Sequence, residues 1–223
     1  MNKRPFLLLW LALLGGSGLV GAQQPTPHQT LPPLSSWLDT PTPAPSMPGG
    51  ISPLATAKSN VTYNLNRKPD PDPGEQAAYD KITRTMDEAV RYYNQHSAGL
   101  TKVLQVSYDP GVPTADGNSN GSVRFGRDTV SVVATAMHEI AHTMGVGTSG
   151  QWGKLNQKGV FTGPHATAVL REIDHDPKAV VHCDNQHFWP YGLNYAGEVK
   201  SNQDYVNHCK MVTAIAQDLR EVR

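Results

Sequence analysis

The sequence has few cysteines, few aromatic residues and no net charge. Only Cys183 and Cys209 occur in 223 residues, which excludes a disulfide-rich miniprotein and a zinc ribbon with cysteine ligands. A metal site in this chain would therefore use histidine and carboxylate side chains. The 19 basic residues are balanced by 19 acidic ones, which removes the electrostatic argument for nucleic-acid binding. Hydrophobic residues at 38% and aromatic residues at 7% are typical of a chain that is folded only in part.

The first residues have the pattern of an export signal. A basic start is followed by an apolar run from Phe6 to Leu14 and by small residues ending at Ala22. The run is too short to span a bilayer comfortably, since a span takes about 20 residues. We therefore expect residues 1–22 to be a cleaved signal peptide and the mature chain to be secreted or periplasmic, without a stable membrane span. An uncleaved anchor is the alternative.

Export also changes how the next segments are interpreted. Two thiols in an oxidising compartment usually pair, so we expect a disulfide between Cys183 and Cys209. Residues 23–57 contain nine of the 18 prolines and almost no charge, which predicts a Pro-rich linker. The folded domain is expected at 58–223, and we expect it to be a monomer.

The patterns in that domain predict a mixture of strands and helices. Asp72, Pro73 and Glu75 form a helix-start signature, so a helix is expected from Pro73 to about His96. A second helix is expected from Asp128 to Met144, because apolar residues recur there at helical intervals. Further elements are predicted as strands at 61–65, 103–108 and 122–125, a loop at 109–121, and helices at 166–173 and from 201 onward.

The loop at 116–121 has a run of Asp, Gly, Asn and Ser that matches half of an EF-hand calcium loop. Position twelve of that pattern is Arg127 instead of a bidentate glutamate. The run is therefore interpreted as a flexible turn, and the sequence leaves calcium binding there open.

The second helix carries the one motif with chemical meaning, His138-Glu139-Ile-Ala-His142. Histidines four residues apart lie about 40° apart around a helix, so both imidazoles leave one face and can bind one Zn²⁺. Zinc lowers the pKa of bound water towards about 7, and a neighbouring carboxylate can take the proton of that water. The motif therefore predicts zinc-dependent hydrolysis with Glu139 as general base.

The order strand, helix, strand, short strand and HExxH helix resembles that of the zincin metallopeptidases over about residues 60–147. The run from His138 to Gly145 matches the first eight positions of the metzincin signature HExxHxxGxxH. The resemblance implies an α+β fold with a small mixed sheet and a mostly helical C-terminal subdomain. It also implies that the strand at 122–125 lies along the cleft and pairs with an extended substrate.

Thr148 stands where that signature has its third histidine, so a third ligand has to come from elsewhere. A catalytic zinc usually has three protein ligands and one open position. We favour His187, because Phe188 and Trp189 offer it a rigid setting. Glu172 is the second choice, by its resemblance to the ligand glutamate of gluzincins, and His165 and His208 stay open.

Other residues are candidates for supporting roles. Tyr191 and Tyr195 could donate to a developing oxyanion, although packing explains them as well. His208 could approach the substrate or the zinc, or be a buried structural histidine. The sequence as a whole predicts an exported zinc metalloendopeptidase that acts on polypeptides. The alternatives are a zinc-containing binding or adhesion module without catalysis, and a zinc hydrolase acting on a cell-wall or glycan amide.

Overall fold

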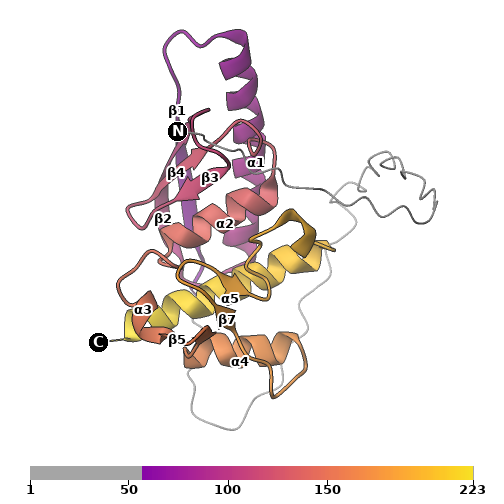
Figure 1. Cartoon of the computed structure of the whole chain (residues 1–223). Helices are drawn as coiled ribbons and strands as arrows, with labels where there is room; N and C mark the ends of the chain where they lie inside the picture. The colour runs from indigo at the N-terminus through magenta and orange to yellow at the C-terminus, as the bar shows by residue number, and fades with distance from the viewer. Residues whose placement is uncertain (1–56, 223) are drawn as a thin grey trace, which may run out of the picture. The chain divides into compact units, whose positions relative to one another are not determined.

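The HExxH segment lies in a layer of two helices packed on a four-stranded sheet (Figure 1). The structure is a computed structural model that describes residues 57–222. These residues fall within one unit of the chain, Gly49–Arg223. The predictions for the signal peptide and for the linker, apart from its last residue, lie outside the described residues.

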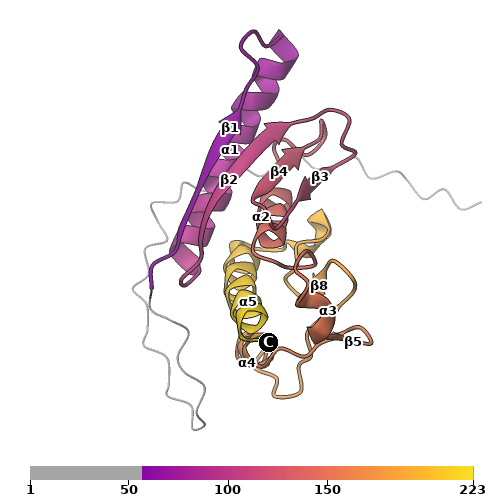
Figure 2. The same cartoon turned by 90° about the vertical axis from the view of Figure 1, so that its left-hand side faces the viewer.

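The sheet has the strand order β1-β2-β4-β3, which can be followed in Figure 2. Strands β1 (Asn60–Asn66), β2 (Thr101–Tyr108) and β4 (Ser122–Phe125) run parallel to one another. The short strand β3 (Ala115–Gly117) runs antiparallel to β4 and forms the edge of the sheet. This finding corrects two expectations, because β3 lies inside the predicted loop and takes the edge place expected for 122–125.

Helices α1 (Pro73–His96) and α2 (Val133–Thr143) pack against the sheet and against each other. The predicted start of α1 is confirmed, since the Asp72 carboxylate accepts from the backbone of Glu75 and Glu75 accepts from the backbone of Asp72. The buried side chains of the strands face this layer, and the opposite side chains of β2 are exposed. One face of the sheet therefore forms the core with the two helices, which gives α2 a fixed support.

Helix α2 begins five residues later than the sequence pattern predicts. Asp128 is exposed and makes no cap, and the residues before Val133 form turns. The hydroxyl of Thr129 donates to the carbonyl of Thr114, and the hydroxyl of Thr85 donates to the carbonyl of Val130. These bonds tie the Thr129 side chain and the Val130 carbonyl to other elements, so the segment does not continue the helix.

The C-terminal part combines helices with a second sheet of two-residue strands. Helix α4 (Pro164–Ile173) packs against the long helix α5 (Asn202–Glu221), whose predicted start is supported by a bond from the Ser201 backbone to Asp204. The remaining elements of this part are α3 (Trp152–Leu155), β5 (Asn156–Gln157), β6 (Val160–Phe161), β7 (His182–Cys183), β8 (Phe188–Trp189) and the 3₁₀-helix η2 (Ala196–Glu198). The four strands form an antiparallel sheet in sequence order. The predicted α+β class is thus confirmed.

The predicted disulfide is wrong, because Cys183 and Cys209 are both free and buried. Cys183 lies in β7 and pairs with Phe188 across the small sheet. Cys209 lies in α5, where its carbonyl accepts from the Ser97 hydroxyl just after α1. Cys183 and Cys209 therefore belong to different elements, β7 and α5.

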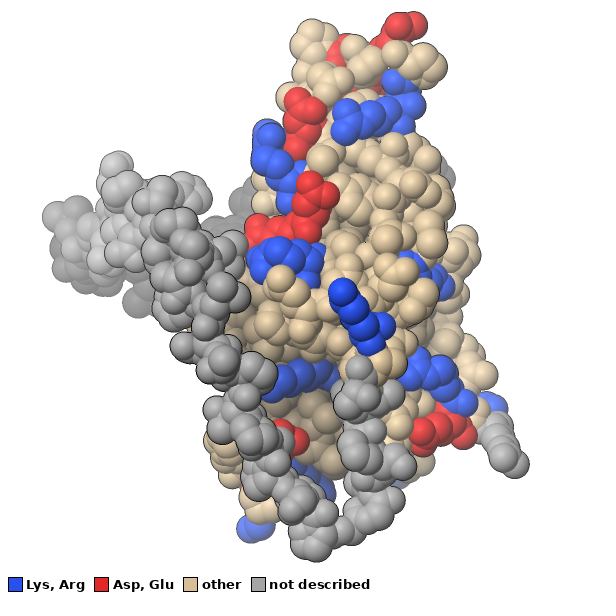
Figure 3. Space-filling view, turned by 180° about the vertical axis from the view of Figure 1, so that it is seen from behind, with Lys and Arg blue, Asp and Glu red and all other residues tan. Residues whose placement is uncertain are grey.

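Two surface findings bear on partners. Among residues 57–222, no helix is long and apolar enough to cross a membrane. On the face seen in Figure 3, Lys and Arg side chains lie close to Asp and Glu side chains, and the described residues there form no large patch of one sign.

Candidate metal centre

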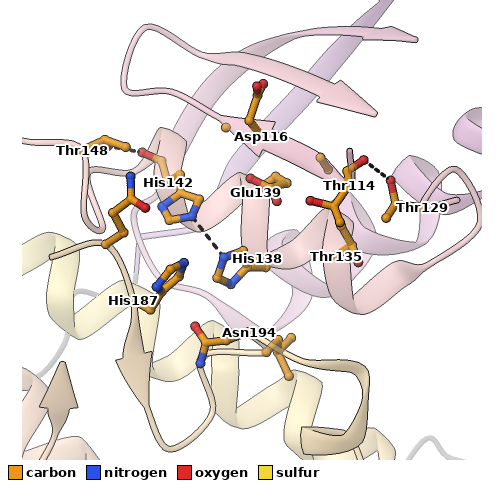
Figure 4. A pocket seen from close by; sticks show the side chains of 14 residues that line it. Thr114, Asp116, Thr129, Thr135, His138, Glu139, His142, Thr148, His187 and Asn194 are labelled. Carbon is orange, nitrogen blue, oxygen red and sulfur yellow. Dashed lines mark hydrogen bonds between the residues drawn. The ribbon is translucent and has the colours of Figure 1, made fainter. Parts of the chain in front are cut away.

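Three histidines from two distant segments meet beside α2. His138 and His142 leave one face of the helix one turn apart, as the spacing predicts, and His187 approaches from the turn between β7 and β8 (Figure 4). The Nε2 atoms of His138 and His142 lie 3.1 Å apart, and one ring nitrogen from each of the three residues lies within 4.8 Å of the others. Two nitrogens bound to one tetrahedral zinc are about 3.3 Å apart, so the spacing of the pair fits a shared ion.

The other ring nitrogen of each histidine is already used. Nδ1 of His138 donates to the carbonyl of Gly192 and Nδ1 of His142 to the carbonyl of Val146, both at 2.8 Å. Nδ1 of His187 donates to the Asp184 carboxylate at 3.0 Å. Because these partners can only accept, each Nδ1 is the hydrogen-bond donor. In the neutral rings of His138 and His142 the Nε2 atoms are therefore left with lone pairs that converge.

Converging lone pairs repel one another unless a cation lies between them. Burial, and then the neighbouring His142, lower the pKa of His138 to about 3, and burial also lowers the pKa of His142. Both rings are thus neutral at pH 7, which is the form that binds a metal ion. The donor set, its spacing and its fixed tautomers fit a metal ion, and the cluster could hold one.

Glu139 lies beside the histidines with its side chain buried, only 5% exposed. Burial, and then the negative charge of Asp116, raise the pKa of Glu139 to about 8, while a hydrogen bond from the Gly117 backbone opposes this rise. Strand β3 passes so close that a Cβ on Gly117 would lie 2.2 Å from the carbonyl oxygen of Glu139. Glycine at 117 therefore lets the edge strand and α2 come together.

These groups line a cavity of about 320 Å³. Its walls are the segment 114–117 with β3, the face of α2 that carries His138, the turn that carries His187, and residues 193–194. In Figure 4, Glu139 lies towards Asp116 and β3, and Asn194 lies on the opposite side of the histidines. A ligand in this cavity would thus contact the candidate metal ligands, a carboxyl group and the edge of the sheet.

The loop after α2 shows how Thr148 is used in place of a third histidine at position 148. The hydroxyl of Thr148 donates to the carbonyl of His142 at 2.5 Å and so closes the end of the helix. Gly145 and Gly147 both have positive φ values, which turn the chain away from the helix axis. A Cβ on Gly147 would lie 2.2 Å from the carbonyl oxygen of Gln186, so this glycine lets the His187 turn approach.

The other candidates for the third ligand lie away from the cluster. Glu172 is exposed on α4. His165 is buried, and its Nε2 bonds to Glu221 at 3.0 Å. His208 is fully buried, with Nδ1 donating to the carbonyl of Tyr191 and Nε2 next to the hydroxyl of Tyr93. None of these three residues lines the cavity.

The two candidate oxyanion donors are also outside the cavity. The hydroxyl of Tyr191 donates to Asp174 at 2.8 Å. The side chain of Tyr195 is 69% exposed and does not line the cavity. The described cavity therefore offers neither tyrosine to a developing oxyanion.

Sequence reasoning missed several residues that complete the cluster. Asp184 accepts from the backbone of Gln186 and His187 as well as from the His187 ring, and an aspartate three residues before a histidine was the available signal. Asn194 and the carbonyl of Gly192 had no such signal, because their roles depend on how the chain folds back after β8.

Comparison of the chain with protein-family models, with curated proteins and with solved structures found no match.

Proposed function

We propose that the protein is an exported zinc-dependent metalloendopeptidase with a zincin-like catalytic domain. The observation that carries the proposal is the convergence of one ring nitrogen from each of three histidines, whose rings are held through Nδ1, next to a buried glutamate in a cavity. Three histidines with an open fourth position are a ligand set of catalytic zinc. The signal-like pattern of residues 1–22 is the ground for proposing a secreted or periplasmic location.

The chain's own residues supply binding and proton transfer. His138, His142 and His187 would hold the ion, which when bound polarises a carbonyl and lowers the pKa of water. Glu139 takes a proton from the attacking water and later gives a proton to the leaving amine. Burial makes its carboxylate a stronger base than an exposed glutamate, although a bound cation lowers its pKa again.

The edge strand supports a polypeptide as the substrate. β3 pairs with β4 on one side, and it forms part of the cavity wall. An extended peptide can add to such an edge through main-chain hydrogen bonds, which places its peptide bonds next to Glu139. β3 therefore takes the role that the resemblance to zincins implies for the strand along the cleft.

The proposal is tested by metal analysis of the purified protein together with hydrolysis of casein as an unstructured substrate. We expect about one zinc per chain and metal-dependent cleavage. Glu139→Gln should retain zinc and lose activity by a factor of about 10² to 10⁴. Glu172→Gln, a change of the same kind on the exposed face of α4, is the matched control and should keep full activity.

Each outcome has a clear meaning. Unchanged turnover in Glu139→Gln would remove this residue from the mechanism. Zinc at one per chain without hydrolysis of any protein would refute the peptidase and favour a binding module. His187→Ala should reduce zinc occupancy far more than Glu172→Ala, and the reverse result would overturn the ligand set.

A further inference from the structure

Asn194 has an amide group whose orientation is fixed by its neighbours. Its Nδ2 donates to the carbonyl of Phe188 at 2.9 Å and to the Glu198 carboxylate at 3.2 Å. Both partners are acceptors, so the opposite orientation of the amide would place oxygen against oxygen. The side chain therefore presents Oδ1 in one defined direction.

That oxygen has no partner within the chain. Oδ1 of Asn194 is buried and accepts no hydrogen bond, while the residue lines the cavity beside the histidines. In Figure 4 the oxygen is on the side of the amide that faces His138 and His187, and the nitrogen is turned away. A buried acceptor without a donor is costly, so the arrangement is satisfied best when a ligand in the cavity supplies the donor.

An extended peptide bound along β3 has such donors. In a strand, the N–H groups of successive residues point to opposite sides. The N–H groups on one side can pair with β3, which leaves those on the other side directed away from it. Asn194 lies on the side of the histidines opposite to β3, where these remaining groups need an acceptor.

We propose that Asn194 is a substrate-binding residue whose Oδ1 accepts a hydrogen bond from a main-chain N–H of the bound polypeptide, on the side that faces away from β3. The inference rests on the proposed function, because it takes an extended polypeptide as the ligand. The residue clamps the substrate between the edge strand and the segment after β8.

The experiment is a double-mutant cycle that combines the substitution Asn194→Ala with the removal of single N–H groups from a peptide substrate. A short peptide that the wild-type protein cleaves is chosen from a casein digest and resynthesised with one ester in place of each non-scissile amide near the cleavage site. Each ester removes one N–H with little change in shape. Binding is measured on zinc-loaded Glu139→Gln protein and cleavage on active protein, with and without Asn194→Ala.

With Asn194 present, we expect the ester at the N–H that faces this residue to bind and react about tenfold less well than the parent peptide, the order of one lost hydrogen bond. The Asn194→Ala protein should bind and cleave the parent peptide and this ester equally well. Glu198→Gln is the matched control, because it alters a partner of Nδ2 and leaves Oδ1 in place. It should keep the tenfold difference.

The outcomes separate this inference from the function on which it rests. If the wild-type protein cleaves no peptide, the proposed function fails and the inference fails with it. If it cleaves peptides but each ester loses the same affinity and rate, relative to the parent peptide, with and without Asn194, only the inference is overturned. If Asn194→Ala does not fold, the wild-type arm still decides, because an affinity equal to that of the parent peptide for every ester at an N–H directed away from β3 contradicts a bond from Oδ1 to a substrate N–H.

Discussion

Gly147 is the position at which a single added carbon should disable the proposed metal centre. The residue follows α2 by four positions, has a φ of +66° and lies against the backbone of Gln186, the neighbour of His187. In Gly147→Ala the new Cβ would meet the Gln186 carbonyl oxygen at 2.2 Å and its Cα at 2.4 Å. Both contacts are with backbone atoms, so no side-chain rotation relieves them.

The size of the effect follows from this geometry. An ordinary contact begins near 3.4 Å, so the His187 turn has to move away by about 1.2 Å. Metal–ligand distances tolerate only about 0.2 Å of error. A shift of this size therefore removes His187 from the ligand set, and we expect zinc affinity to fall by at least the 10- to 100-fold typical of a lost supporting contact. The positive φ adds roughly 1–2 kcal/mol of strain to the folded state.

The assay is a competition titration with a chromophoric zinc chelator, accompanied by thermal unfolding of the zinc-free protein. Gly150→Ala is the control, since a Cβ there meets no atom within 4 Å and the residue lies in the same loop. It should bind zinc like the wild-type protein. Equal zinc affinity in Gly147→Ala and Gly150→Ala would refute the argument that the close approach at Gly147 positions the third ligand.

Two further predictions concern the groups that hold the ligands in place. Asp184→Asn keeps an oxygen for the backbone N–H groups of the turn but loses the acceptor for Nδ1 of His187, so zinc affinity should fall about 10- to 100-fold in the same titration, with little change in unfolding temperature. Unchanged affinity would contradict a role for this carboxylate. Burial lowers the pKa of His208 to about 4, while a histidine in an unfolded chain has a pKa near 6.5. Between pH 4 and pH 6.5, unfolding is therefore accompanied by the uptake of a proton at His208. The stability supplied by neutral His208 is therefore present above pH 6.5 and is lost as pH falls to 4, by roughly 3 kcal/mol. Urea unfolding at pH 7.5 and 4.5 should show His208→Asn losing more stability, relative to wild type, at the higher pH, and a constant difference would refute the assignment.

The elements that the sequence predicts best are those with local causes. The start of α1 depends on Asp72 and Glu75 bonding to each other's backbone, which four consecutive residues decide. The start of α2 was placed too early, because the Thr129 hydroxyl bonds to Thr114, a residue in a different segment. Strand β3 was missed for a similar reason, since three residues become a strand only by pairing with β4.

The residues of the candidate site likewise differ in whether their positions have a local cause. The positions of His138, Glu139 and His142 follow from helical spacing alone. His187 was one of several histidines after the helix, and its aromatic neighbours only favoured it. The disulfide was predicted from the pattern of residues 1–22 and the cysteine count, and neither says where the free and buried Cys183 and Cys209 lie in the fold.

The groups that hold the rings of His138 and His142 could not be predicted from side-chain patterns in the sequence. Nδ1 of His138 and Nδ1 of His142 both donate to main-chain carbonyls, at Gly192 and Val146, and any residue type carries such a carbonyl. What the sequence does record is the glycine that lets the chain reach these places. A Cβ at Gly192 would meet the carbonyl oxygen of Phe188 at 2.0 Å, so only glycine fits where the chain folds back over His138. In this chain Gly192, and not a side-chain pattern, is therefore the residue that records where the chain returns to the helix histidines.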